Sequence, residues 1–411
     1  MGMLTTLRTP GNIPEWCTDE SVVLEPPAEN VATGWAPATR PAAPIMNWLQ
    51  NLYGKWVRYF QKALLSTWQH LDYATKYTTP HAAIFHPDKG VWIIANRDGD
   101  SHCTYLASRD GQNFEVETTV DDSIFTSTVF GSTIAIDSAR FLMGTTNGIH
   151  YRTDPDTWAL KSNATIGATG GIKGICTEYP TYDYVVAVDY TGKVYHSTVV
   201  TGTWTAATTQ PPLVPGGTLV CAKFIRVDNT SIYYLLLADD DNAKLYRSTN
   251  RGVTWNAIGY PFADSGCVAR NMAYNPDTGV FVVVGYSADD TAHIEYSSNG
   301  STWFSATKDF AGMDTITNTS LNDVYYCGNG FFVTGGMFPY AAGHGSNGMN
   351  ILVSDGGYTW RMTQVRIDAE ATVPDSLYCV WTFACNGNFL LAGTSAGYFI
   401  TQSNGVYIEG V

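Results

Sequence analysis

The chain reads Ser248-Thr249-Asn250-Arg251-Gly252-Val253-Thr254-Trp255, which combines a hydroxyl residue, an asparagine, a glycine and a closing tryptophan in one short stretch. Related stretches occur elsewhere in the 411 residues. Close copies run over 353–360, 297–303 and 108–114, and weaker ones end at Trp158, Trp204 and Tyr407. A motif that recurs in this way indicates a repeat protein.

The spacing of the repeat predicts its architecture. The closing aromatics stand at 114, 158, 204, 255, 303, 360 and 407, so successive copies lie 44, 46, 51, 48, 57 and 47 residues apart. That is the length of one four-stranded propeller blade. A β-branched or aromatic run leading toward glycine precedes each copy, at 91–95, 141–144, 184–188, 233–238, 280–285, 331–335 and 389–393. We therefore predict an all-β fold, a β-propeller of seven blades, or alternatively six, over residues 80–411.

The residues of the motif suit a tight hairpin between strands. Asp or Asn can bond its own nearby backbone, and Gly supplies the positive φ that the turn needs. The closing aromatic can bury a large area between neighbouring sheets. We assign this structural role to Asp110, Phe114, Trp158, Trp204, Asn250, Gly252, Trp255, Asn299, Trp303, Asp355 and Trp360.

Composition narrows the function classes. Hydrophobic residues make up 45% of the chain, charged residues 15%, and the net charge is −14. A strongly acidic chain is a poor partner for nucleic acid, because phosphate binding needs basic patches. No apolar run reaches the ~20 residues of a membrane span, and the first residues lack the apolar core of a signal peptide. The eight cysteines form no CxxC pair and are expected to be buried thiols.

The N-terminal part has a different character. Residues 1–43 are rich in proline, which predicts an extended arm that needs a partner surface. Residues 44–75 contain an apolar stripe with heptad-like spacing, which predicts an amphipathic helix for docking or oligomerisation, or alternatively for packing on its own propeller. The candidate anchoring residues are Trp16, Trp35, Ile45, Trp48, Leu49, Leu52, Trp56 and Tyr59.

The recurrent motif resembles the Asp-box, or BNR repeat, of sialidases and related propellers. In that family the motif lies on the periphery of the propeller, so the resemblance implies a fold and no chemistry. A sialidase would also need an arginine cluster, a Tyr/Glu nucleophile pair and an acid Asp. The family's Arg-Ile-Pro signature is missing, since Val227 follows Arg226. Sialidase activity is therefore disfavoured.

A second resemblance covers about residues 11–70. The stretch from Gly34-Trp35 through Arg40-Pro41 to Asn47-Trp48-Leu49 looks like the leader of bacteriophage tail fibre, tail spike and tail appendage proteins. The resemblance implies a virion tail protein assembled in the host cytoplasm. It also implies attachment to other tail proteins through this leader, and a homo-oligomer, with a trimer favoured.

One long insertion separates two of the later copies. Residues 335–350 are rich in glycine and carry Phe338, Tyr340 and His344, which we take as receptor-binding candidates, or alternatively as a loop packed on a neighbouring subunit. The acidic run 239–242 is interpreted as a solvated hairpin tip, and the spacing of His81 and His86 disfavours zinc. We assign no catalytic residue, no cofactor and no metal.

Three functions remain open on the sequence. The leading hypothesis is a phage tail protein, anchored by its N-terminus, whose propeller binds a bacterial surface glycan or protein. The second is a glycan-cleaving tail depolymerase, which would require a pair of carboxyl groups at a suitable distance. The third is a structural joint of the tail that never contacts the host.

Overall fold

The structure is a computed structural model. It describes residues 67–71 and 77–402, apart from short stretches between strands, of which the longest are 121–133, 163–170, 212–217, 310–319, 338–347 and 368–378. The chain divides into two compact units, Met1–Thr67 and Trp68–Val411. The predicted arm, the predicted helix up to residue 66 and the anchoring residues lie outside the described residues.

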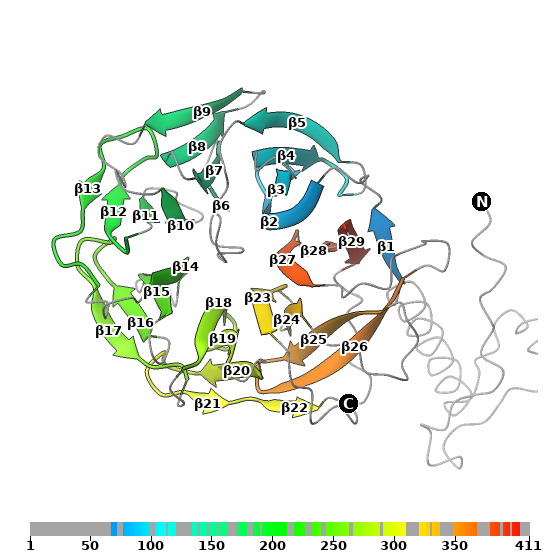
Figure 1. The fold of residues 1–411 in the computed structure, drawn as a ribbon. Coiled ribbons are helices and arrows are strands. Elements are labelled where there is room, and N and C mark those ends of the chain that lie inside the picture. Colours follow the sequence, from blue (N-terminus) through cyan, green and yellow to red (C-terminus); the bar gives the residue numbers. More distant parts are fainter. Residues whose placement is uncertain are drawn as a thin grey trace, which may run out of the picture. The chain divides into compact units, whose positions relative to one another are not determined.

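Five antiparallel four-stranded sheets stand as separate blades in the second unit (Figure 1). In each blade the strands pair in chain order. They are β2 (Tyr77–His86), β3 (Val91–Asp98), β4 (Cys103–Ser108) and β5 (Glu115–Val120); β6 (Ile134–Ile136), β7 (Arg140–Thr145), β8 (Gly148–Thr153) and β9 (Thr157–Ser162); β10 (Ile172–Thr177), β11 (Val185–Asp189), β12 (Val194–Ser197) and β13 (Thr205–Ala206); β14 (Thr218–Arg226), β15 (Ile232–Asp239), β16 (Lys244–Ser248) and β17 (Asn256–Gly259); and β18 (Val268–Asn275), β19 (Val280–Tyr286), β20 (Ala292–Ser297) and β21 (Phe304–Ser305).

The remaining strands form one nine-stranded sheet in the order β23-β24-β25-β26-β1-β29-β28-β27, with β22 paired in parallel to β26. Their bounds are β1 (Thr67–Leu71), β22 (Thr307–Asp309), β23 (Ser320–Tyr326), β24 (Phe331–Met337), β25 (Gly348–Asp355), β26 (Thr359–Ile367), β27 (Val380–Cys385), β28 (Phe389–Thr394) and β29 (Gly397–Gln402). Together with the five blades, this sheet completes a ring of radially arranged strands (Figure 1). The predicted β-propeller fold is therefore confirmed.

Three details of the prediction need correction. The described residues form five separate blades rather than seven or six, because β1 lies between β26 and β29 and joins the ladders of the last two repeats. In addition, Thr67–Leu71 was assigned to the helical segment 44–75, whereas it is a strand that pairs with β29 through Gln69–Ile400, His70–Phe399 and Leu71–Tyr398. The first strand of the first blade begins at Tyr77, ahead of the expected start at residue 80.

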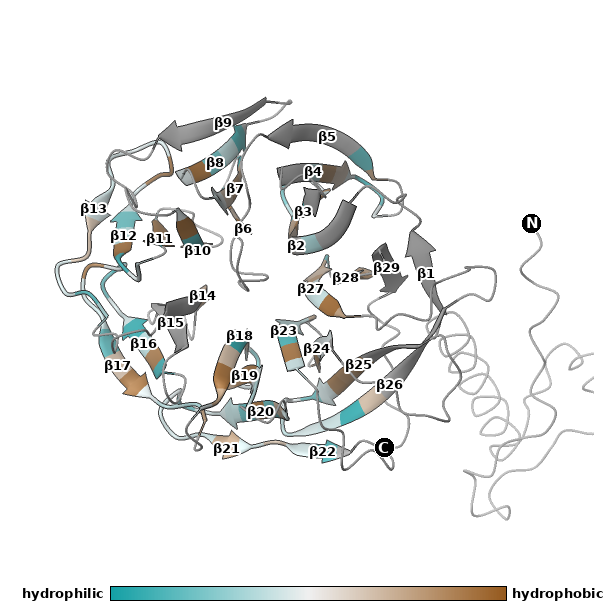
Figure 2. Ribbon diagram, viewed as in Figure 1, coloured by the Kyte–Doolittle hydropathy of each residue, from teal (hydrophilic) through white to brown (hydrophobic). Residues whose placement is uncertain are grey.

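In the third and fifth blades, burial is high in the second strand and lowest in the outermost strand. All five residues of β11 are buried, as are all but the last of β19, whereas both residues of β13 and of β21 are exposed. Figure 2 shows hydrophobic and hydrophilic segments side by side on inner strands such as β10, β18 and β23, and hydrophobic segments also on the outer strands β17 and β21. The innermost strands contact one another in a cyclic order, which is β2, β6, β10, β14, β18, β23, β27 and back to β2.

Glycines at the ends of second strands let these inner strands approach closely. A Cβ at Gly144 would lie 2.9 Å from the backbone oxygen of Ile172, and one at Gly335 would lie 2.9 Å from Val380. In both cases the neighbour belongs to the innermost strand of the next repeat. Glycine is needed here because any larger side chain would push the two inner strands apart.

The recurrent turns have one hydrogen-bond pattern. Ser248 Oγ accepts a hydrogen bond from the amide of Gly252 at 2.9 Å, and the same serine-to-glycine bond links 108 with 111, 297 with 300 and 354 with 357. The Asn250 side-chain oxygen accepts from the Thr254 amide at 2.9 Å. Gly252 has φ +82, which glycine adopts without strain.

The closing aromatics lie in the seams between sheets. The indole N–H of Trp255 donates to Gly252 O at 3.0 Å, and those of Trp303 and Trp360 donate to Gly300 O and Gly357 O. Trp255 belongs to the same buried cluster as Val186 and Val194 of the preceding blade. Phe114 likewise shares a cluster with Leu391 of β28. Each of these turns therefore closes its own hairpin and also holds a neighbouring sheet.

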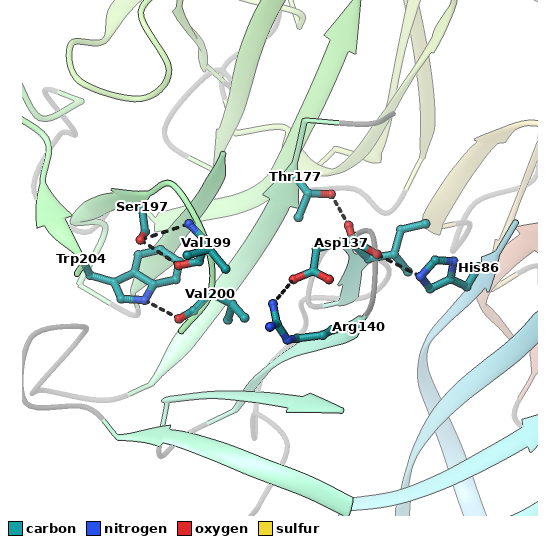
Figure 3. A network of polar contacts seen from close by, with 9 residues as sticks. His86, Asp137, Arg140, Thr177, Ser197, Val199, Val200 and Trp204 are labelled. Atoms are coloured by element: carbon teal, nitrogen blue, oxygen red, sulfur yellow. Dashed lines mark hydrogen bonds and ion pairs between the residues drawn. The ribbon is translucent and has the colours of Figure 1, made fainter. Parts of the chain in front are cut away.

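Polar contacts also cross the seams near the ring centre (Figure 3). His86 at the end of β2 bonds the carbonyl oxygen of Asp137 at 2.9 Å, and the Thr177 hydroxyl at the end of β10 donates to Ile136 O at 2.5 Å. Arg140 forms an ion pair with the Asp137 carboxylate at 2.9 Å. Burial lowers the pKa of His86, so this side chain favours its neutral form. Three blades are thus tied together at the inner end of their seams.

Candidate ligand-binding cleft

A cleft opens where three innermost strands, β14, β18 and β23, lie next to one another. Its cavity volume is about 530 Å³, which is within the range of small-molecule sites. The lining residues are mainly apolar and aromatic, with one cation: Lys223, Phe224, Ile225, Met272, Ala273, Tyr274, Pro276, Phe281, Val324, Tyr325 and Tyr326.

The turn between β18 and β19 fixes one wall of the cleft. The Asn275 side-chain oxygen accepts from the amides of Asp277 at 2.8 Å and Thr278 at 3.3 Å, and this holds the turn in shape. The Tyr326 hydroxyl, at the end of β23, then donates to Asp277 Oδ2 at 2.7 Å. This bond links the end of β23 to the turn that follows the neighbouring inner strand, β18.

Aromatic rings support each other along the same wall. The rings of Tyr274 and Phe281 lie 4.7 Å apart at 46°, and those of Tyr326 and Phe332 lie 5.2 Å apart at 58°. Such tilted pairs are favourable beyond their burial. Burial raises the pKa of the Tyr325 phenol, so its hydroxyl stays protonated. The cleft therefore presents rigid ring surfaces, and the phenol of Tyr325 beside them is neutral.

β-bulges in the inner strands place polar side chains beside the cleft. The pairing register shifts between Leu219 and Cys221, between Ala269 and Asn271, and between Leu321 and Asp323, with equivalent shifts in β10 and β27. A bulge re-aims the side chains that follow it. The consequence is that polar residues meet across successive seams.

These residues form a chain of hydrogen bonds through four inner strands. The Cys221 thiol donates to Asn271 Oδ1 at 2.9 Å, and Asn271 Nδ2 donates to Asp323 Oδ1. The Phe383 amide donates to Asp323 Oδ2 at 2.7 Å. Asn322, next to Asp323, donates to Val380 O at 3.0 Å. We call Cys221, Asn271, Asp323 and the Phe383 amide the inner polar chain.

Asp323 is the ionisable group of this chain. Its side chain is buried, and burial raises its pKa to about 6, although the Lys223 charge and the hydrogen bonds from Phe383, Asn271 and Val324 oppose the rise. The neutral and charged forms of Asp323 therefore interchange near pH 6 within the inner polar chain.

The residues singled out in the sequence lie elsewhere. Those of the recurrent turns lie in the hairpins and seams described above, Trp204 is buried and donates its indole N–H to Val200 O at 3.0 Å, and Trp158 lies in β9. Phe338, Tyr340, His344 and Tyr407 lie outside the described residues. The cleft residues were missed, although aromatic residues at Phe224, Tyr274 and Tyr325 recur at about one repeat length and could have served as a signal.

Within the described part of the chain, no helix is long and apolar enough to cross a membrane. The same residues contain no group of three or more His, Cys, Asp or Glu placed to hold a metal ion.

Comparison with known proteins identifies the fold alone. No family model and no curated protein matches the sequence. Among solved structures, YCF48 from Cyanidioschyzon merolae has a TM-score of 0.55 at 11% identity, covering 82% of this chain and 98% of that one. A YCF48 bound to a D1 peptide has a TM-score of 0.54 at 15% identity, with 82% and 99% covered. The WD40 β-propeller domain of Doa1 has a TM-score of 0.53 at 15% identity, with 82% and 96% covered.

Proposed function

We propose that this chain is a structural component of a bacteriophage tail, anchored through its N-terminal residues, whose β-propeller binds a bacterial surface glycan or protein. The resemblance of residues 11–70 to phage tail leaders supports the anchoring role. The aromatic cleft of β14, β18 and β23 carries the binding role.

The character of the cleft favours binding over hydrolysis. Its described lining contains one cation, Lys223, and no carboxylate, whereas most glycoside hydrolases use a pair of carboxyl groups. Rigid rings such as Tyr274 offer flat apolar surface at low entropic cost, and the ammonium of Lys223 suits an acidic sugar or a peptide carboxylate. A solved propeller of this fold, YCF48, is bound to a peptide, which supports protein binding as one use of such a ring.

The test is adsorption of virions that carry cleft variants. We expect Tyr274→Ala and Tyr326→Ala to leave virion assembly intact and to reduce adsorption about fivefold or more, since truncating a central aromatic anchor costs over ~1 kcal/mol. Tyr260→Ala is the matched control, because Tyr260 is 54% exposed and lies outside the cleft lining.

Other outcomes select the alternatives. Unchanged adsorption with both cleft variants, and also after deletion of residues 80–411, would indicate a tail joint without host contact. Release of sugar when the purified chain is incubated with host surface glycan would indicate a depolymerase.

A further inference from the structure

Cys327 and Cys385 lie close together where the first and last strands of the nine-stranded sheet contact each other. β23 and β27 are the first and last strands of that sheet, and yet they contact each other on the inside of the ring. Cys327 follows β23 directly and Cys385 ends β27. The Cys385 thiol donates to Cys327 O at 3.7 Å, and a side-chain hydrogen bond joins the two thiols. The two sulfur atoms are therefore neighbours.

We propose that Cys327 and Cys385 form a disulfide when the protein meets a low-molecular-weight disulfide such as oxidised glutathione. Both are thiols in the structure. Cys385 is partly exposed, whereas Cys327 is 4% exposed. Cys385 is thus the thiol that the reagent can reach, and Cys327 is the thiol that resolves the first product.

The exchange proceeds in two steps. The Cys385 thiolate attacks one sulfur of oxidised glutathione, which forms a mixed disulfide and releases one glutathione thiolate. The Cys327 thiolate then attacks the Cys385 sulfur and releases the second glutathione thiolate. Two protein thiols are oxidised, one glutathione disulfide is reduced, and the two protons are taken up by the released glutathione. Because burial raises the pKa of Cys327 well above its ordinary value, the second step should accelerate with rising pH.

The other described cysteines are placed differently. The Cys221 thiol donates to Asn271, and Cys379 accepts a hydrogen bond from Asn322 Nδ2 at 3.1 Å. Both are buried, as are Cys176 and Cys267, which keeps a reagent away from all four. Among the six cysteines whose side chains the structure describes, the cross-link would therefore be selective for Cys327 and Cys385, and it would join the two edges of the nine-stranded sheet covalently.

The experiment uses the reduced full-length chain. It is incubated with oxidised glutathione at about pH 8, near the ordinary thiol pKa, quenched with N-ethylmaleimide and mapped by peptide mass spectrometry. We expect a linked peptide pair containing Cys327 and Cys385. Because the bond closes a long loop, we also expect the apparent Tm to rise by roughly 5 °C.

Variants separate the two steps. Cys327→Ser should stop at a glutathione adduct on Cys385, Cys385→Ser should give neither product, and Cys379→Ser should still form the cross-link. An unresolved adduct on Cys385 in the natural chain, an absence of reaction over days, or a cross-link that forms only in urea would each overturn the proposal. Peptide mapping of the chain without substitutions tests the proposed cross-link even if a variant fails to fold.

Discussion

Trp255 shows how one side chain contributes to both a hairpin and a seam. Its ring is 1% exposed, it packs in a cluster with the preceding blade, and its N–H bonds Gly252 O. We expect Trp255→Phe to lower the free energy of unfolding by about 1–2 kcal/mol, because the hydrogen bond is lost. Trp255→Ala should cost about 3–5 kcal/mol, because a large cavity is added. Urea unfolding measures both changes.

The matched control is Trp303→Phe. The Trp303 indole makes the equivalent bond to Gly300 O at 3.2 Å, but this residue is only half-buried. Water can replace a bond there, so the cost should stay below about 1 kcal/mol. Equal losses in the free energy of unfolding for Trp255→Phe and Trp303→Phe would show that burial of the indole in the seam does not determine the cost of losing its hydrogen bond.

Asp323 makes stability depend on pH. Its pKa is about 6 in the folded chain against an ordinary 3.8, so between these values the folded state binds the proton more tightly than the unfolded state. Stability is therefore full below about pH 4 and falls as pH rises through 6, by up to roughly 3 kcal/mol for a shift of two units. Urea unfolding at a series of pH values should show this fall.

The comparison variant is Asp323→Asn, which removes the titrating group and keeps the side-chain shape. Subtracting its pH profile from that of the natural chain isolates the contribution of Asp323. A difference that rises with pH, or that is flat between pH 4 and 7, would contradict a raised pKa.

At the scale of elements, β1 is the strand that joins the last two repeats. It is paired on both sides, with β26 and with β29. A proline at His70 removes a backbone donor from a central strand, so we expect His70→Pro to cost about 3 kcal/mol or more. His70→Ala keeps the donor and serves as the control. A proline variant as stable as the alanine variant would argue that β1 contributes little to the sheet.

The features of the fold that depend on residues close together in the sequence were predictable. The recurrent turns follow from serine, asparagine and glycine at fixed places, and the buried second strands follow from runs such as Val280–Gly285. The pairing of Gln69 with Ile400 was not predictable in this way, because its two partners lie at opposite ends of the chain and a five-residue strand carries little pattern. The segment was instead read as the end of a helix, since the apolar stripe before it continues to Leu64.

The cleft was missed for a related reason. Its residues belong to three strands, and the bulges that place Asn271 and Asp323 side by side change the register by a single residue. Periodicity does not reveal such a shift. The contact between Tyr326 and Asp277 likewise depends on two neighbouring repeats being docked. Composition showed many aromatics but not which of them would gather.

At the scale of the whole molecule, the burial gradient predicts how the ring opens. The amides of β11 and β19 should exchange hydrogen slowest, and those of β13 and β21 fastest, in every blade alike, because protection follows burial and hydrogen bonding. Hydrogen exchange read by mass spectrometry tests this. Protection that is uniform within a blade and differs stepwise between blades would instead show that blades open one at a time.

The position of β1 also affects how the propeller resists a pulling force. Tension applied to the chain before Thr67 enters the propeller through this strand, whose ladders with β26 and β29 must both yield before it leaves the sheet. In the antiparallel β1–β29 pair the hydrogen bonds run perpendicular to the strands. A pull along β1 would therefore shear these bonds together, whereas a pull across it would open them one after another. The resistance of the propeller to force should depend on the direction from which its N-terminal segment is pulled.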